Sequence, residues 1–233
     1  MHRRLELAVV IPTLNEERSI GLCLDSVGTH DGVEVVVVDG GSADNTVRCA
    51  REAGARVVED SPGRGSQLNL GARSTDSDRL LFLHADCVLP DGWLWELNRA
   101  LDKNEVALAC FRLRTLSSIS SKPSLMYRWW LRVFDLRSHG FVLPYGDQGF
   151  AVKREVFDRI GGFPEIPLME DVSFAGDCRR QGKIERLRLE ISTTARRVEQ
   201  RPFRTTLMLV FFPTLFRLGV SPQTLARWYG SAQ

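Results

Sequence analysis

The sequence predicts an α/β fold in which helices flank both faces of a mostly parallel sheet. Two observations predict it. Along the first part of the chain, apolar runs of strand length alternate with segments whose apolar residues recur at helical spacing. The apolar runs are also continuous rather than alternating with polar residues, which is typical of strands buried on both faces. Strands and helices that alternate in this way form βαβ units, whose strands lie parallel.

The first part of the chain accommodates four strands and three helices. We expect the strands at residues 5–12, 33–41, 55–60 and 79–86, and the helices within residues 13–29, 42–54 and 63–74. Ser42 or Asp44 can cap the second helix, and Gly54 can end it.

After Pro90 the pattern changes. We expect helices at residues 91–103 and 167–182, strands at 106–114 and 183–192, a strand and a helix within 148–157, and an aromatic-rich helical insert at 125–137. The tail is apolar with interspersed arginines. We therefore expect one domain over residues 1–200. A helical tail over residues 201–233 would pack on that domain, on a partner subunit or on a membrane surface.

Composition limits the partners and the compartment. A net charge of +2 requires no polyanionic partner, so we expect no binding to nucleic acid. Five cysteines without a paired spacing argue against a disulfide framework and against a zinc site. The first apolar run is short, no cleavage-site pattern follows it, and no stretch approaches the ~20 apolar residues of a transmembrane helix. These features predict a cytoplasmic protein.

Polar residues follow three of the expected strands at the point where each strand ends. They are the segment from Pro12 to Glu16, then Asp39, and then Asp86. In open α/β sheets, ligands bind outside the carboxyl ends of the strands. The sequence therefore predicts a ligand site at this edge of the sheet.

Four segments together resemble the ordered signature of the family 2 glycosyltransferases, whose fold is a Rossmann-like GT-A-type sheet flanked by helices. The segments are VVIPTLNEERSI, VVVVDGGSADNT, LFLHAD and PLMEDVSFAGDCRRQG. A further run, LPYGDQGFAVKREVFDRIGGFPEIPLMED, resembles a bacterial subgroup described as radical-SAM/selenodomain-associated glycosyltransferases. That description fixes no substrate.

The resemblance implies a binding site for a nucleoside-diphosphate sugar on the first two strands. Pro12, Thr13 and Asn15 shape the first turn, Glu16 matches the position that binds the ribose, and Asp39 matches the carboxylate that accepts a hydrogen bond from the uracil N–H. UDP is therefore the expected carrier. The alternative for Asn15 and Glu16 is helix capping.

In the family an Asp-x-Asp motif binds a divalent cation, and here its first acid is replaced by His84. The resemblance makes Asp86 the expected ligand of Mn²⁺ or Mg²⁺, which neutralises charge on the leaving diphosphate. His84 contacts the ribose or the diphosphate, favours Mn²⁺ because imidazole suits softer metals, or only packs at the end of its strand. The alternative for Asp86 is a loop acid that caps the following helix.

Three arginines are candidates for the diphosphate. Arg64 lies between two glycines, and such a turn lets the backbone and the guanidinium approach a phosphate. Arg196 and Arg197 follow the last expected strand, where one of them could compensate for the missing acid. For all three, the alternative is an ordinary arginine that is exposed to solvent and has no role in binding the diphosphate.

The pair Glu170 and Asp171 resembles the family's Glu-Asp pair. Inverting transfer needs a base that removes the proton of the acceptor hydroxyl, and Asp171 is the expected base. Glu170 would position it or perturb its pKa. The alternative is that both acids cap the helix that follows.

The residues that hold the acceptor or the donor sugar are the least constrained by the sequence. Asp147 and Gln148 match the subgroup's pattern, although Asp147 could equally stabilise a turn. Trp129 lies in the aromatic-rich insert, where stacking on a sugar competes with ordinary core packing.

The sequence thus predicts a metal-dependent, inverting glycosyltransferase with a nucleoside-diphosphate sugar donor and an unknown acceptor, either a small molecule or lipid-linked. A catalytically weak nucleotide-sugar-binding module is the alternative that the altered Asp-x-Asp permits. A nucleotidyltransferase is disfavoured because the first turn lacks a glycine-rich loop with a lysine. The apolar tail leaves open a homodimer and peripheral contact with the inner face of the membrane.

Overall fold

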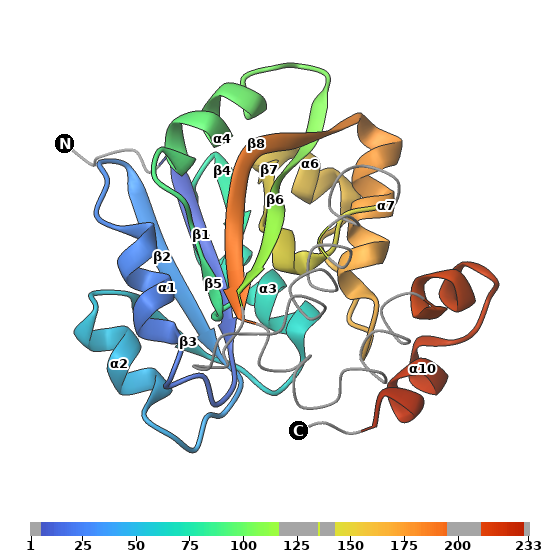
Figure 1. The fold of residues 1–233 in the computed structure, drawn as a ribbon, viewed down its shortest axis with the longest axis horizontal. Coiled ribbons are helices and arrows are strands. Elements are labelled where there is room, and N and C mark those ends of the chain that lie inside the picture. Colours follow the sequence, from blue (N-terminus) through green and yellow to red (C-terminus); the bar gives the residue numbers. More distant parts are fainter. Residues whose placement is uncertain (1–5, 117–134, 136–142, 195–210, 231–233) are drawn as a thin grey trace, which may run out of the picture.

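The computed structural model describes residues 6–116, 135, 143–194 and 211–230. Within these residues one eight-stranded sheet runs through the molecule, in the order β3-β2-β1-β4-β7-β6-β8-β5. Helices cover both of its faces (Figure 1). The predicted α/β fold class is therefore confirmed.

The first half of the sheet is parallel, as the βαβ pattern predicts. Its strands are β1 (Leu7–Thr13), β2 (Val33–Asp39), β3 (Arg56–Glu59) and β4 (Arg79–Phe82). The helices between them are α1 (Ile20–Val27), α2 (Thr46–Glu52) and α3 (Arg64–Arg73). Parallel strands that run in one direction place all their carboxyl ends at one edge, which is the edge where the polar tips follow β1, β2 and β4.

The second half of the sheet is mixed. It contains β5 (Cys87–Val88), β6 (Val106–Leu116), β7 (Phe150–Lys153) and β8 (Lys183–Thr194). β7 is antiparallel to both β4 and β6, whereas β8 is parallel to β6 and antiparallel to β5. The sheet is therefore mostly parallel with two antiparallel strands. The sequence did not predict β5, because two residues are too few to show a strand period.

The remaining elements of the described chain are short helices. They are α4 (Trp93–Leu101), the 3₁₀ turn η2 (Gly146–Gln148), α6 (Arg154–Ile160), α7 (Glu170–Gln181) and α10 (Pro222–Tyr229). Residues 211–217 are also helical.

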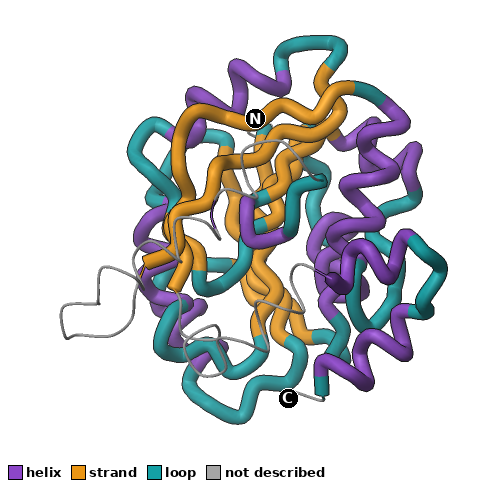
Figure 2. Tube along the Cα trace, turned by 45° about the vertical axis from the view of Figure 1, so that its right-hand side comes forward, coloured by secondary structure: helices purple, strands orange, loops and turns teal. Residues whose placement is uncertain are grey.

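Two hydrophobic clusters lie on opposite faces of the sheet. Val9 and Ile11 of β1 belong to the cluster under α1 and α4, whereas Val10 belongs to the cluster under α3, α6 and α7. Figure 2 shows the strands between the two sets of helices. Because each residue of β1 from Leu7 to Ile11 belongs to one cluster or the other, this part of the strand is apolar throughout, and this explains the continuous runs.

Helix α3 packs unusually close to the sheet, and this closeness depends on glycine. A Cβ placed on Gly71 would lie 2.3 Å from Cγ1 of Val10, so only glycine lets the helix approach to this distance. At the other end of α3, a Cβ on Gly65 would lie 2.5 Å from the carbonyl oxygen of Pro164. The position of Arg64, the first residue of α3, is therefore fixed from both ends of its helix.

The predicted division at residue 200 stays a prediction, because residues 195–210 lie outside the described part of the chain. The described residues of the tail are helical, at 211–217 and in α10. The insert predicted at 125–137 also lies outside the described residues, apart from residue 135. Among the helices that the structure describes, none is both long and apolar enough to cross a membrane.

Candidate active site

The carboxyl ends of the parallel strands bring the predicted donor residues together. Thr13 and Asp39 are the last residues of β1 and β2, and they are paired in register. His84 and Asp86 follow β4, whose Phe82 pairs with Val10 of β1. The three strand tips therefore share one edge of the sheet.

Asp39 holds the loop after β2. Its carboxylate accepts hydrogen bonds from Oγ1 of Thr13 (3.0 Å), from Oγ of Ser42 (2.6 Å), and from the backbone N–H groups of Gly41 (3.0 Å) and Ser42 (2.8 Å). A carboxylate offers about four acceptor sites, and here they are used within the protein. Asp39 is also only 2% exposed. Direct contact with uracil stays a prediction, and this geometry gives it little support.

Asn15 and Glu16 tie the first loop to the second. Asn15 has a left-handed backbone with φ 55°, its N–H donates to Oγ of Ser42 (2.8 Å), and its Oδ1 accepts from the N–H of Ala43 (2.9 Å). The N–H of Glu16 donates to Oγ1 of Thr46 (2.8 Å). The side chain of Asn15 therefore bonds the neighbouring loop instead of capping α1. A non-glycine residue held at positive φ is frequent at ligand-binding loops.

Gln67 is a further residue of this edge, and the sequence did not predict it. This buried side chain of α3 donates from Nε2 to the carbonyl oxygens of Thr13 (2.9 Å) and Val38 (2.8 Å), where β1 and β2 end. The signal was present, because Gln67 stands four residues before the buried Gly71 on the same helical face. A polar side chain on the inward face of a helix needs a buried partner.

Glu170 and Asp171 are the first residues of α7, which begins three residues later than the helix predicted at 167–182; Glu170 is buried and Asp171 is half-buried. The preceding Met169 has a left-handed backbone with φ 72°. Oδ2 of Asp171 accepts from the N–H of Gly146 (2.8 Å), and its Oδ1 accepts from the N–H of Val172 (2.7 Å). Burial, together with the charge of Glu170, raises the pKa of Asp171 to about 6. The alternative that these two acids cap α7 is not supported, because the N-cap is Met169 and no side-chain cap hydrogen bond is present there. The bond between Asp171 and Val172 is a local contact within the first turn.

Arg64 links α3 to this acidic pair. Its Nη1 lies 3.2 Å from Oε1 of Glu170, which is 3% exposed. Burial disfavours the charged guanidinium, but the carboxylates of Glu170, Asp171 and Asp86 outweigh it and raise the pKa of Arg64 above its ordinary value. Arg64 is therefore a permanent cation that interacts with three carboxylates, two of them adjacent at the start of α7 and one after β4.

His84, Arg64 and Asp171 line one small pocket together. The other lining residues are Leu68, Phe82, Gly146, Phe150 and Phe163. A Cβ on Gly146 would lie 2.8 Å from Nε2 of His84 and 3.4 Å from Asp171, so the backbone at Gly146 fills the space between them. The pocket has an apolar floor and a polar rim made by an arginine, a histidine and an aspartate.

Cys87 lies between Asp86 and the turn that contacts Asp171. Its Sγ lies 3.5 Å from the carbonyl oxygen of Asp147 and 3.9 Å from Oδ1 of Asp86. Burial and the nearby Asp86 raise the pKa of this thiol well above its ordinary value, so it remains protonated and able to donate. All five cysteines are free, and Cys87 is one of four that are buried.

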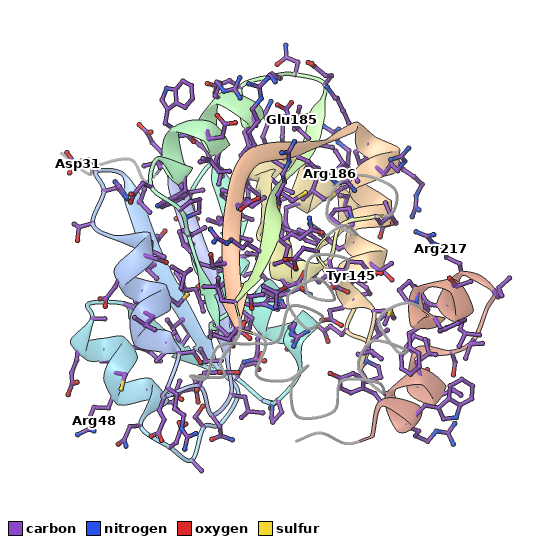
Figure 3. All side chains as sticks on the ribbon, viewed as in Figure 1. Asp31, Arg48, Tyr145, Glu185, Arg186 and Arg217 are labelled. Atoms are coloured by element: carbon purple, nitrogen blue, oxygen red, sulfur yellow. The ribbon has the colours of Figure 1, made fainter. Side chains whose placement is uncertain are left out.

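The structure gives Gln148 a structural role. It is 1% exposed, its Nε2 donates to the carbonyl oxygen of Phe111 (2.9 Å), and its Oε1 accepts from the N–H of Tyr145 (3.1 Å). Figure 3 labels Tyr145 near the centre of the molecule. Contact of Gln148 with an acceptor is not supported by this geometry. Asp147 is half-buried in the same turn. Trp129, Arg196 and Arg197 lie outside the described residues.

Among the described residues, a divalent metal would need ligands from the substrate or from water in addition to protein side chains. No group of three or more His, Cys, Asp or Glu side chains among the described residues could hold a metal ion. Asp86, which is half-buried at the strand tip, supplies one hard oxygen, and His84 stands two residues before it. Mg²⁺-type ions are commonly bound by one or two carboxylates, substrate phosphates and water. The residues present fit that kind of site.

Comparison with known proteins identifies the family. The model of the family described as "Glycosyl transferase family 2" matches residues 8–163 of this chain. Glucosyl-3-phosphoglycerate synthase of Mycobacterium tuberculosis is 35% identical over 96 residues, which cover 36% of this chain and 30% of that protein. The dolichyl-phosphate hexose transferase of Haloferax volcanii is 42% identical over 84 residues, covering 35% of this chain and 36% of that protein. The chain therefore spans about a third of the length of these relatives.

Solved structures agree with this assignment. The same mycobacterial synthase, in complex with Mn²⁺, UDP and phosphoglyceric acid, matches with a TM-score of 0.57 and 25% identity, over 79% of this chain and 69% of that one. The mannosyltransferase PcManGT of Pyrobaculum calidifontis, in complex with GDP-Man and Mn²⁺, has a TM-score of 0.68 over 97% of this chain and 68% of that one. At 22% identity the second likeness shows the fold alone. The chain belongs to glycosyl transferase family 2.

Proposed function

We propose that this chain transfers a sugar from a nucleoside-diphosphate sugar to the hydroxyl group of an acceptor. The observation that carries the proposal is the arrangement at the start of α7. A half-buried carboxylate, Asp171, has a pKa raised to about 6 and lies in one pocket with Arg64 and His84. A base whose pKa lies near the working pH is the group that such a transfer requires.

The reaction is a single displacement with inversion. The hydroxyl proton of the acceptor passes to Asp171, whose orientation is fixed by the N–H of Gly146. The acceptor oxygen bonds to the anomeric carbon on one face while the bond to the diphosphate breaks on the other. Arg64, a permanent cation at the pocket rim, stabilises the negative charge of the leaving diphosphate.

A divalent metal belongs to this proposal as a cofactor. Asp86 would hold it together with oxygens of the donor diphosphate, and the bound ion would neutralise part of the charge that develops on the leaving group. The support is the complex of the mycobacterial synthase, which contains Mn²⁺.

From the resemblance of residues 143–171, we propose that the chain belongs to the radical-SAM/selenodomain-associated subgroup. As the carrier of the donor sugar, we propose UDP. The synthase complex contains UDP and supports this choice, whereas the mannosyltransferase complex contains GDP-Man. The carboxylate of Asp39 is already hydrogen-bonded within the protein, which weakens the argument that it recognises uracil. The carrier therefore needs to be measured directly.

The alternative is a catalytically weak module that binds nucleotide sugars, and the observation that favours it is His84 in place of an acid. One experiment distinguishes the transferase from the binding module. UDP- and GDP-linked sugars are incubated with the protein, with Mn²⁺ or with EDTA, and release of the nucleoside diphosphate is measured. A transferase of this kind slowly hydrolyses its donor in the presence of Mn²⁺, and Asp171→Asn abolishes that release. Binding without any release with every donor contradicts the transferase.

A further inference from the structure

Two helices, residues 211–217 and α10, lie at the end of the described chain, and the first of them ends in a well-defined cap. The N–H of Val220 donates to the carbonyl oxygen of Leu215 (3.0 Å), and the N–H of Gly219 donates to that of Phe216 (3.0 Å). Gly219 has φ 93°. These two bonds around a left-handed glycine make a Schellman motif. The preceding residue, Leu218, is therefore held in place and is not part of a frayed end.

The second helix begins just as sharply. Ser221 is the N-cap of α10, and its Oγ accepts from the N–H of Thr224 (3.2 Å). Pro222 occupies the first turn, where its fixed φ suits a helix start. Local sequence therefore specifies the whole turn between residues 217 and 222.

This helical pair, residues 211–230, exposes large apolar side chains. Leu218 is 78% exposed, and Phe211 and Trp228 are each 52% exposed. Phe212 and Leu225 are buried instead, so each helix packs one side and leaves apolar groups on the other. Large apolar side chains that are left exposed along one short segment are typical of an interaction surface.

The charges of the helical pair have one sign. None of residues 211–230 is acidic, and the basic residues are Arg217 and Arg227, both exposed. Figure 3 shows Arg217 at the top of the pair. In Figure 1 the pair lies on the right, beside the α7 side of the molecule. Tryptophan and tyrosine, which stand together here at residues 228 and 229, are enriched where proteins meet the boundary between lipid and water.

We propose that this helical pair binds the surface of an anionic lipid bilayer. Leu218, Phe211 and Trp228 enter the headgroup region, and the two arginines meet acidic headgroups while their stems lie along the apolar layer. Charge complementarity selects this partner, because a surface with cations and without acids matches anionic lipid. Membrane binding stands independently of the proposed transferase function. If both hold, the enzyme works where lipid-borne acceptors are concentrated.

Liposome flotation tests the proposal. We expect the full chain to float with vesicles that contain phosphatidylglycerol and to remain largely free with pure phosphatidylcholine. The double variant Leu218→Ser and Trp228→Ser should lower the bound fraction at least tenfold. The matched control is Leu22→Ser with Trp95→Ser, since those side chains are 65% and 69% exposed on α1 and α4. That control should float like the unaltered protein.

Charge is tested separately. Arg217→Gln with Arg227→Gln should weaken binding to anionic vesicles by about fivefold per arginine. Arg73→Gln with Arg179→Gln removes the same charge from exposed positions on α3 and α7 and should have little effect. Equal losses in both charge variants would show that only the net charge matters and would overturn the proposed site.

Two further results would also overturn it. One is the absence of flotation with anionic vesicles. The other is a concentration-dependent dimer, seen by sedimentation, that Leu218→Ser with Trp228→Ser dissociates, because a second copy would then occupy the surface. Donor hydrolysis in solution should be unchanged in that variant. Flotation without hydrolysis would refute the proposed function alone, and hydrolysis without flotation would refute the membrane proposal alone.

Discussion

At the scale of single residues, the site depends on how Asp171 is surrounded. Burial and the neighbouring Glu170 disfavour its charge, whereas the N–H of Gly146 and the cation of Arg64 favour it. The balance leaves a carboxylate that is ionised at neutral pH and still basic enough to accept a proton. An exposed aspartate, with a pKa near 3.9, would be a much weaker base.

Asp171→Asn should lose turnover and keep donor binding. The amide cannot take a proton, so the rate should fall by roughly 10²–10⁴-fold. Titration calorimetry with the nucleoside diphosphate measures binding, and release of that product from the sugar donor measures turnover. Lost affinity with unimpaired turnover at saturating donor would assign Asp171 to the donor site instead.

The rate of the unaltered enzyme should depend on pH through the same group. Asp171 must be ionised to act, so the rate should fall about tenfold per pH unit below about 6 and level off above it. Arg64 lowers the pKa of Asp171, so Arg64→Ala should move this acidic limb to higher pH. A limb that stays in place in that variant would mean that another group titrates.

His84→Asp should restore the acid that the Asp-x-Asp pattern contains. A second carboxylate is a harder ligand than imidazole, so the ratio of Mg²⁺-supported to Mn²⁺-supported activity should rise. The measurement is donor hydrolysis with each metal in both proteins. Identical ratios would show that residue 84 does not influence the metal.

At the scale of elements, α3 carries both Arg64 and Gln67 to the sheet edge, and its approach to β1 depends on Gly71. A Cβ there would lie 2.3 Å from Val10, which is far inside contact distance. Val10 belongs to the sheet, so the helix must move outward to relieve the overlap with its side chain. The contacts of Arg64 and Gln67 would then lengthen.

Gly71→Ala should therefore lower the free energy of unfolding by about 1–3 kcal/mol and reduce turnover as well. The matched control is Gly21→Ala in α1, where nothing lies within 4 Å of the new Cβ. That change should be neutral or stabilise the protein by up to about 1 kcal/mol, since alanine favours a helix. Urea unfolding of both variants gives the comparison, and equal stabilities would mean that α3 adjusts without strain.

At the scale of the whole molecule, the sequence predicts what local patterns encode. Continuous apolar runs located β1 to β4, and the polar residues that follow β1, β2 and β4 lie at one edge of the sheet, where binding stays a prediction. The pairs that complete the site are distant in sequence, such as Arg64 with Glu170, and Gly146 with Asp171. Neither pair has a local signature. The two-residue β5 and the inward bond of Gln67 likewise depend on neighbours that only the fold supplies.

Because the site joins residues from both halves of the sheet, a bound donor should stabilise the entire fold. A ligand at 100 times its Kd adds about 2.7 kcal/mol to the free energy of unfolding, and each kcal/mol raises Tm by about 2–4 °C in a chain of this size. Saturating nucleoside diphosphate with Mn²⁺ should therefore raise Tm by roughly 5–10 °C. Asp86→Asn should lose the part of this shift that depends on Mn²⁺, because a neutral amide is a poor ligand for a hard cation. Asp171→Asn should keep the full shift, because it alters the base and leaves the metal ligand intact. Differential scanning calorimetry with and without EDTA measures all three proteins. A shift that is equally large in Asp86→Asn, or one that EDTA leaves unchanged, would place the metal elsewhere.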